Sequence, residues 1–255
     1  MSLNHDSVNS RLQSLFQATS KHSDYQRLHP SVQALVGSEV APAGRHEAER
    51  QHWMARHRQL EGLCVLDIGA NTGYFSFAAL AGGARRVVSQ EGNPTHAQFI
   101  EVAARGLGLH RRLEVRPSYF DFHAEGEVFD LTLCLNVLHH LGDDFGDRAL
   151  SIDAARASML AALNRLARRT RHLWMQLGFN WKGDRRRPLF AHGTKAELID
   201  FVRRGTAGHW HIEDIVVVDP TTRDYVPLDD ANIARCDAFG EFLNRPLFAM
   251  RSLTL

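Results

Sequence analysis

The pattern of apolar and polar positions along the chain changes near residue 62. Before it, apolar residues recur at helical spacing in SVNSRLQSLFQATS and in AGRHEAERQHWMARHRQL. The stretch between them, HPSVQALVGSEVAPAG, contains prolines and glycines. This pattern predicts two helices joined by a connection. We therefore expect residues 1–60 to form an N-terminal helical cap or lid.

After residue 62, short apolar runs typical of strands alternate with segments of helical period. The expected strands span residues 63–68, 86–91, 112–118, 129–137, 172–179, 210–219 and 247–253. The expected helices span residues 73–81, 94–107, 150–168 and 194–204. Strand–helix alternation predicts parallel strands joined by right-handed crossovers, so residues 61–255 are expected to be one α/β core domain. No clear helix separates the last two strands, which predicts an antiparallel pair. Insertions are expected near residues 180–194 and 220–245.

The composition excludes several classes of protein. The 255 residues are 44% apolar and 23% charged, with a formal net charge of +1. Such values are typical of a globular domain and give no bulk electrostatic reason to expect a nucleic-acid or membrane partner. The three cysteines show no CxxC spacing, which argues against a disulfide framework or a structural zinc site. With no signal-peptide pattern and no long apolar run, the expected location is cytoplasmic.

The segment LDIGANTGYFSF carries the first candidate chemistry. Its first strand is expected to end at Asp67–Ile68, and Gly69 and Gly73 allow positive φ angles and a close approach of a ligand to the backbone. Apart from glycine, asparagine is the residue type that best tolerates the left-handed region of backbone φ/ψ angles, so Asn71 suits such a turn. The second strand is expected to end at Glu91, where an acid can accept hydrogen bonds from both hydroxyls of a ribose. Loop and acid together predict a nucleoside site.

A dinucleotide such as NAD is a weaker candidate for this site. Dinucleotide-binding loops follow G-x-G-x-x-G, whereas here the spacing is G-x-N-x-G, which is one residue shorter. Asp67 stands directly before the loop, and a carboxylate there repels a pyrophosphate but suits a cation. The residues therefore favour a ligand that joins a ribose to a positive charge.

The motifs LDIGANTGYFSF, SQEGN and FDLTLCLNVLHHL together resemble the class I S-adenosylmethionine-dependent methyltransferase superfamily. The resemblance covers roughly residues 60–180 by specific motifs and the rest by strand order. Asn71 replaces the middle glycine of the family pattern D/E-x-G-x-G-x-G. The resemblance implies a three-layer, Rossmann-like α/β sheet of seven mostly parallel strands, with the last strand inserted antiparallel between the fifth and the sixth.

The same resemblance implies S-adenosylmethionine as the cofactor and a set of residues that bind it. Asp67, Gly69 and Gly73 are expected near its methionine and ribose parts, and Glu91 on the ribose hydroxyls. Ser118 stands where the family usually has an adenine-reading acid, so Tyr119 or Phe120 could instead stack on the base. The full expected cofactor-binding set is Asp67, Gly69, Ala70, Asn71, Gly73, Glu91, Gly92, Asn93, Ser118, Tyr119, Asn136 and Val137.

The fourth strand ends in a pair of histidines, His139 and His140, at the carboxyl edge of the expected sheet. Methyl transfer is an in-line displacement that often needs a base, and a histidine can be that base. We expect at most one of the two to take part in the reaction, because one of two adjacent histidines commonly caps a helix or forms a hydrogen bond with the backbone. We assign no metal, although Asn136 and the two histidines, with Asp143 or Asp144, could form a ligand set.

The loop after the fifth strand is expected to contact the methyl acceptor. Asn180, Trp181 and Lys182 combine hydrogen bonding, a flat apolar face and a positive charge, and Trp181 has no obvious core role in a loop. Residues 185–187 are three arginines that could meet a phosphate or carboxylate, but a solvated charge run explains them more simply. Trp53 and Arg50 of the cap could reach the site or merely pack the cap onto the core.

The predicted function is transfer of a methyl group from S-adenosylmethionine to an O, N or C atom of a small polar metabolite or sugar, assisted by histidine. One alternative is a tRNA base-modifying methyltransferase, supported only by clustered arginines. Another is a non-catalytic, S-adenosylmethionine-binding scaffold. The expected partner is a small-molecule substrate rather than a nucleic acid or a membrane, and a homodimer is left open.

Overall fold

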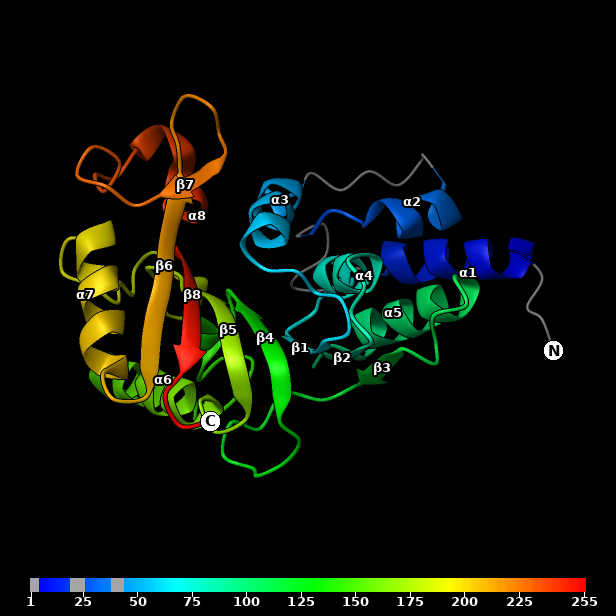
Figure 1. The fold of residues 1–255 in the computed structure, drawn as a ribbon, viewed down its shortest axis with the longest axis horizontal. Coiled ribbons are helices and arrows are strands. Elements are labelled where there is room, and N and C mark those ends of the chain that lie inside the picture. Colours follow the sequence, from blue (N-terminus) through cyan, green and yellow to red (C-terminus); the bar gives the residue numbers. More distant parts are fainter. Residues whose placement is uncertain (1–4, 19–25, 38–43) are drawn as a thin grey trace. The chain divides into compact units, whose positions relative to one another are not determined.

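The structure is a computed structural model that describes residues 5–18, 26–37 and 44–255. The chain divides into two compact units, residues 1–120 and 121–255. Helices and eight strands alternate within the described residues (Figure 1). The elements of the first unit are α1 (His5–Gln17), α2 (Pro30–Val36), α3 (Glu47–His57), β1 (Cys64–Ile68), α4 (Tyr74–Ala81), β2 (Arg86–Gln90), α5 (Pro94–Gly106) and β3 (Leu113–Arg116).

Three parallel strands in the order β3-β2-β1 form the sheet of the first unit. The register places Ile68 beside Gln90, and Gln90 beside Arg116. Because parallel strands end at the same edge, the loops that follow β1, β2 and β3 meet there. This edge carries the glycine loop, Glu91 and Tyr119, so the first unit alone brings together most of the expected cofactor-binding residues.

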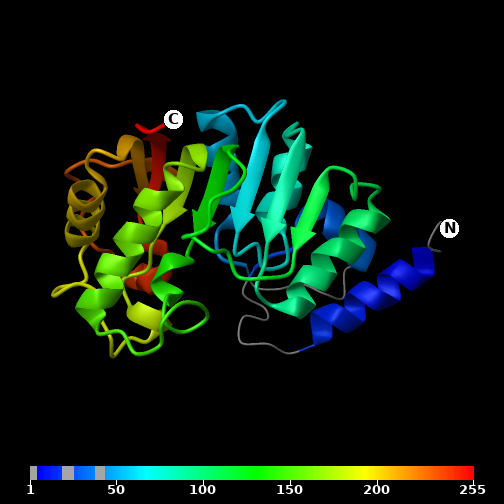
Figure 2. The ribbon, with the colours of Figure 1, turned by 90° about the horizontal axis from the view of Figure 1, so that it is seen from below.

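Helix α4 is buried on every side, which follows from its sequence YFSFAALA and from what covers it. One side of the helix packs on β1 and β2, and α3 lies against it from the N-terminal segment. Helix α1 runs along α5, where Phe16 meets Phe99 with ring centroids 6.1 Å apart (Figure 2). The N-terminal helices thus bury apolar faces of α4 and α5.

Helix α2 corrects the expectation that residues 29–44 are a simple connection. His29 caps its N-terminus, and Pro30 takes the first helical position, where a missing N–H costs nothing. Val32 and Val36 are fully buried, which supplies the packing that a seven-residue helix needs. Residues 38–43 of the expected connection lie outside the described residues.

The second unit contains five strands in the order β4-β5-β8-β6-β7. Its elements are β4 (Phe129–Leu135), the short 3₁₀ turn η1 (Leu138–His140), α6 (Ile152–Leu166), β5 (Thr170–Gln176), the 3₁₀ turn η2 (Trp181–Gly183), α7 (Lys195–Thr206), β6 (Trp210–Val218), β7 (Tyr225–Pro227), the 3₁₀ turn η3 (Asp237–Phe239), α8 (Gly240–Leu243) and β8 (Leu247–Ser252).

The last strand, β8, lies between β5 and β6 and is antiparallel to both, as expected. It is apolar nearly throughout, and Leu247 to Met250 are fully buried, which suits an inner position. Strand β7 adds an eighth strand to the seven expected. It has three residues and pairs with Val216–Val218 at the edge of the sheet. A run this short, next to aspartates and a proline, gives no period-2 signal in the sequence.

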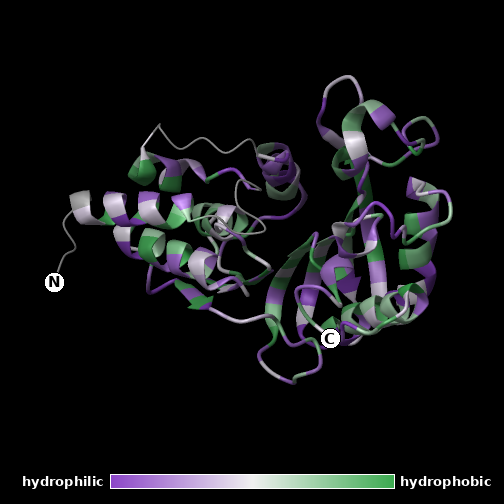
Figure 3. Ribbon diagram, turned by 180° about the vertical axis from the view of Figure 1, so that it is seen from behind, coloured by the Kyte–Doolittle hydropathy of each residue, from purple (hydrophilic) through white to green (hydrophobic). Residues whose placement is uncertain are grey.

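Local signals fix the ends of the second unit's helices. Ser151 caps α6 through the N–H of Ala154, and Thr194 and Glu197 form a capping box on α7. Asp143, Asp144 and Asp147 lie before this cap and do not cap α6. Helices carry alternating hydrophobic and hydrophilic bands (Figure 3). No helix among residues 5–18, 26–37 and 44–255 has the length and apolarity to span a bilayer.

Candidate functional site

The glycine loop between β1 and α4 adopts the predicted left-handed backbone. The φ angles of Gly69, Asn71 and Gly73 are 71°, 54° and 84°. Gly73 is required twice over, since a Cβ there would also lie 3.0 Å from the Phe77 ring and 3.1 Å from Ile100. The loop is tied to the neighbouring strand because the N–H of Gly69 donates to the carbonyl of Gln90 at 2.8 Å.

Glu91 holds the loop from the end of β2. Its Oε2 accepts a hydrogen bond from the Asn71 N–H at 2.7 Å, and its Oε1 accepts one from the Asn93 N–H at 2.8 Å. The residue is only 8% exposed. A carboxylate offers about four acceptor positions, and these two hydrogen bonds use two of them. We call residues 67–73 and 91–93 the glycine-loop site.

Asp67 lies under the loop rather than on its surface. It is 3% exposed, and its Oδ2 accepts a hydrogen bond from the Ser76 hydroxyl at 2.7 Å. The Ser76 hydroxyl is also 2.6 Å from that of Ser89. Burial raises the pKa of Asp67 to about 7, and the negative charge of Glu91 adds to the rise. The sequence suggested a fixed negative charge before the loop; the structure instead gives a carboxyl that ionises near neutrality and that a bound cation would hold ionised.

Ser118 and Tyr119 follow β3 at the same edge of the sheet. The backbone carbonyl and the hydroxyl of Ser118 accept hydrogen bonds from Gln90 Nε2 at 2.7 and 2.8 Å. Tyr119 is 53% exposed, and its ring lies so close to Gly92 that a Cβ there would be 2.2 Å from a ring carbon. Phe120 is buried. Tyr119 is therefore the better of the two aromatic candidates for stacking on a base.

Gln26 reaches the glycine loop from the N-terminal segment, a contact that the sequence did not reveal. Its Oε1 accepts hydrogen bonds from the Tyr74 N–H at 3.0 Å and from the Thr72 hydroxyl at 3.1 Å. It thereby satisfies one of the open N–H groups at the start of α4. Trp53 is 6% exposed and stacks on His57, and the Arg50 guanidinium lies 5.0 Å from the Phe75 ring. These two residues pack the helices onto the core.

Asn136 turns the chain sharply after β4, with a φ of 64°. Its Nδ2 donates to Gln176 Oε1 at 3.0 Å, and its Oδ1 accepts from Arg245 Nη1 at 2.8 Å. Arg245 is 5% exposed and also pairs with Glu241. Burial acts to raise the pKa of Glu241, but the charge of Arg245 holds that pKa below its usual range. We call Asn136, Gln176, Glu241 and Arg245 the buried polar network; Val137 beside it is half-buried.

Arg245→Lys is expected to destabilise the protein by about 1–3 kcal/mol, because an ammonium cannot reach both Asn136 and Glu241 as the guanidinium fork does. Equilibrium urea unfolding measures this. Arg251→Lys is the matched control, since Arg251 lies on β8, the strand that follows Arg245, but is 49% exposed. Equal unfolding free energies for the two variants would contradict a structural role for the network.

His139 and His140 have different surroundings. His139 is 1% exposed, and its Nδ1 accepts the N–H of Gly178 at 3.2 Å. That bond assigns the proton to Nε2, which leaves His139 without an available lone pair on its ring. The side chain of His140 is 15% exposed, and its Nδ1 lies 3.4 Å from Asp144 Oδ2. The geometry thus favours His140 over His139 as a base.

A group of possible metal ligands differs from the one that the sequence suggested. Ligand atoms of His140, Asp143 and Asp144 lie within 4.8 Å of one another. The Asn136 and His139 atoms that could have joined them are bonded to Arg245 and Gly178 instead. The contact between His140 and Asp144 accounts for part of this group, and we assign no metal to it.

The loop expected to contact the acceptor contains one structural residue and two that are more accessible. Trp181 is 3% exposed and donates its indole N–H to the carbonyl of Leu141 at 2.6 Å, so the expectation that it has no core role is wrong. Asn180 and Lys182 are half-buried, and the Lys182 ammonium lies 4.4 Å from the Trp181 ring. Asp184 pairs with Arg186 and Arg187, which explains much of the arginine run as surface charge.

Comparison with known proteins supports the fold. No model of a protein family matches the chain. A tRNA U34 carboxymethyltransferase of Shewanella baltica is 30% identical over 81 residues, which are 32% of this chain and 24% of that protein. The match thus spans about a quarter of that protein's length.

Two solved structures are similar to the chain over nearly its whole length. One is a candidate RNA methyltransferase of Pyrococcus horikoshii, with a TM-score of 0.51 and 11% identity over 99% of both chains. The other is WbdD, a bifunctional kinase-methyltransferase, with a TM-score of 0.60 and 17% identity over 94% of this chain and 47% of that one. The chain has the Rossmann-like fold of the class I S-adenosylmethionine-dependent methyltransferases.

Proposed function

We propose that the protein is an S-adenosylmethionine-dependent methyltransferase whose acceptor is a small polar metabolite or a sugar. The observation that carries this proposal is the pairing of Glu91 with the left-handed loop: its carboxylate fixes the Asn71 backbone from the end of β2, where an acid is placed to accept hydrogen bonds from ribose hydroxyls. The residues present fit such a cofactor. The glycine loop leaves its backbone open to a close approach, Glu91 follows β2, and the buried Asp67 lies beneath the loop.

Three residues at this edge of the sheet have separate tasks in this proposal. Glu91 binds the ribose, Tyr119 stacks on the adenine, and Asp67 balances positive charge on the methionine part. The cofactor supplies a methyl group on a sulfonium cation. Burial of Asp67 strengthens its interaction with a cation because little water screens the charge.

His140 is the base in this proposal, and His139 is a positioning residue. An acceptor hydroxyl or amine must lose a proton as it takes the methyl group, and His140 can receive that proton while Asp144 orients and stabilises its ring. His139 fixes the backbone at Gly178, and its ring lies beside that of His140, with ring centroids 4.4 Å apart. Asn180 and Lys182 offer polar contacts to the acceptor.

The acceptor is identified by incubation with a donor that carries an isotopically labelled methyl group. Cell extract is split into a small-molecule fraction and an RNA fraction, and mass spectrometry finds what gains the label. We expect a labelled product in the small-molecule fraction. Label in the RNA fraction alone would identify RNA, and not a metabolite, as the acceptor. RNA is the acceptor class suggested by the partial match to a tRNA U34 carboxymethyltransferase. No label in either fraction, with the donor still bound, would support the scaffold alternative.

His140→Ala is expected to lower kcat roughly 10²-fold or more without changing donor affinity, since it removes the base and not the cofactor contacts. His139→Ala is expected to act instead on stability, by about 2 kcal/mol, because the Gly178 N–H loses its buried acceptor. His211→Ala, an exposed histidine on β6, is the control. Unchanged kcat in His140→Ala would remove that residue from the mechanism.

A further inference from the structure

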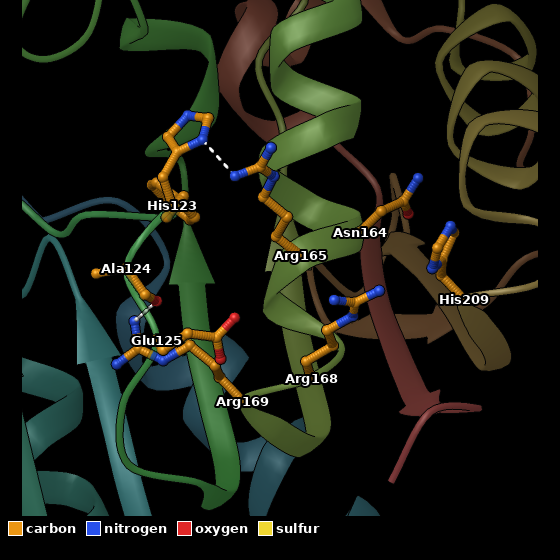
Figure 4. Close-up of a pocket in the computed structure, with 9 residues that line it drawn as sticks. His123, Ala124, Glu125, Asn164, Arg165, Arg168, Arg169 and His209 are labelled. Atoms are coloured by element: carbon orange, nitrogen blue, oxygen red, sulfur yellow. Dashed lines mark hydrogen bonds between the residues drawn. The ribbon is translucent and has the colours of Figure 1, made fainter.

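The second unit contains a cavity of about 360 Å³ at the edge of the sheet where β4, β5 and β6 begin (Figure 4). Its walls come from three separate segments that directly precede these strands. His139 and His140 follow the opposite, carboxyl end of β4, so the cavity does not belong to the site already described. Its polar lining comprises His123, Glu125, Arg165, Arg168, Arg169 and His209, together with Asn164.

Two of the three arginines are held in place by hydrogen bonds. Arg169 is 9% exposed and donates from Nη1 to the carbonyl of Ala124 at 3.2 Å and to that of Asp121 at 3.4 Å. Arg165 lies with Nη1 2.6 Å from His123 Nδ1. Figure 4 shows these two side chains turned to the loop before β4, while Arg168 extends toward His209. The cavity is therefore bordered by fixed positive charge and by one guanidinium that is less constrained.

Positively charged side chains outnumber acids in the lining of this cavity. In the part of the chain that the structure describes, Arg165 and Arg168 form no ion pair, and Glu125 is the one carboxylate in the cavity's lining. The C-terminus of α6 favours a cation at Arg165, which accounts for one of the arginines. The helix C-terminus does not account for three guanidinium groups and two imidazole rings around one cavity.

We propose that this cavity binds the phosphate group of a nucleotide, either free or within an RNA chain. Guanidinium groups match phosphate oxygens in charge and in their planar, two-donor geometry. The volume lies in the range of small-molecule sites, which is enough for a phosphate with its sugar. His123 and His209 add donors of moderate strength at the rim. The proposal does not depend on the methyl-transfer function, because it uses none of the same residues.

Isothermal titration with inorganic phosphate and with adenosine 5′-monophosphate tests the site, with chloride added to keep the ionic strength constant. We expect both to bind, and Arg168→Gln to weaken each at least roughly tenfold through loss of a charge-assisted hydrogen bond. Arg203→Gln is the matched control: Arg203 is likewise an exposed arginine, at the end of α7, with no ion pair among the described residues. Its binding should equal that of the wild type.

The source of the phosphate is read from a parallel titration with a short single-stranded RNA. Binding of the mononucleotide and the RNA with equal affinity identifies a small ligand, whereas much tighter binding of the RNA, weakening steeply with salt, identifies a polynucleotide. In both cases Arg168→Gln must lose the binding and Arg203→Gln must keep it. The proposal is overturned if none of the probes binds the wild type, or if the two variants weaken binding equally. Arg165→Gln provides a second test should Arg168→Gln fail to fold.

Discussion

Glu91→Ala is expected to weaken S-adenosylmethionine binding by roughly 10²- to 10⁴-fold. Two hydrogen bonds from ribose hydroxyls to a carboxylate contribute roughly 1.5–3 kcal/mol each, and both are lost together. The variant also frees the Asn71 and Asn93 N–H groups that Glu91 now binds, so the loop loses its fixed shape. Isothermal titration with S-adenosylmethionine measures the effect.

A conservative variant separates the two causes of this loss. Glu91→Gln keeps one acceptor oxygen at nearly the same place, so part of the loop's support remains while the charge is gone. We expect its affinity to fall between those of the wild type and Glu91→Ala. Glu101→Ala, at an exposed ion pair on α5, should bind as the wild type does. An affinity in Glu91→Ala within a factor of two of the wild type would refute the assignment of Glu91 to the ribose.

Asp67 is expected to make the protein less stable as pH rises from about 4 to 7. The pKa of Asp67 is about 7 in the folded chain and 3.8 when unperturbed, so the folded state binds more protons than the unfolded state in this window. The free energy of unfolding then falls with rising pH, by up to about 4 kcal/mol, and levels off above pH 7. Below pH 4 the carboxyl is neutral in both states and has no effect.

Asp67→Asn removes this titration while keeping a hydrogen-bond acceptor for Ser76. Urea unfolding at several pH values between 5 and 8 is measured for both proteins, and the difference between them isolates Asp67 because the other titrating groups are shared. We expect the variant to gain stability relative to the wild type as pH rises. Parallel curves would show that Asp67 does not titrate in this range.

Much of the fold could be predicted because its strands are strongly patterned. Strands β1, β2 and β4 are short segments built around buried apolar residues, and the expected boundaries agree with the structure to within two residues. The antiparallel place of β8 was implied by the resemblance and confirmed. Helix α2 and strand β7 were missed because seven and three residues are too few for a period to show, and packing stabilises them.

The sequence predicted the parts of the candidate site that depend on local backbone conformation. It did not predict those that depend on partners far away in the sequence. Left-handed geometry at Asn71 follows from the residue types of the loop, and it was confirmed. The bond between Asn136 and Arg245 joins positions 109 residues apart, and no local pattern signals it. The one available sign was an arginine directly before an apolar strand. Trp181 was misjudged for the same reason, since its partner Leu141 lies 40 residues away.

A crystal structure of the protein with S-adenosylhomocysteine is the most direct measurement of the central claim, that a sulfur-bearing nucleoside binds at residues 67–73 and 91–93. The account predicts both ribose hydroxyls on the Glu91 carboxylate and the adenine against the Tyr119 ring. It is contradicted if S-adenosylhomocysteine does not bind at the glycine loop at saturating concentration, or if a dinucleotide soaked in its place sets its pyrophosphate against Gly69 to Gly73.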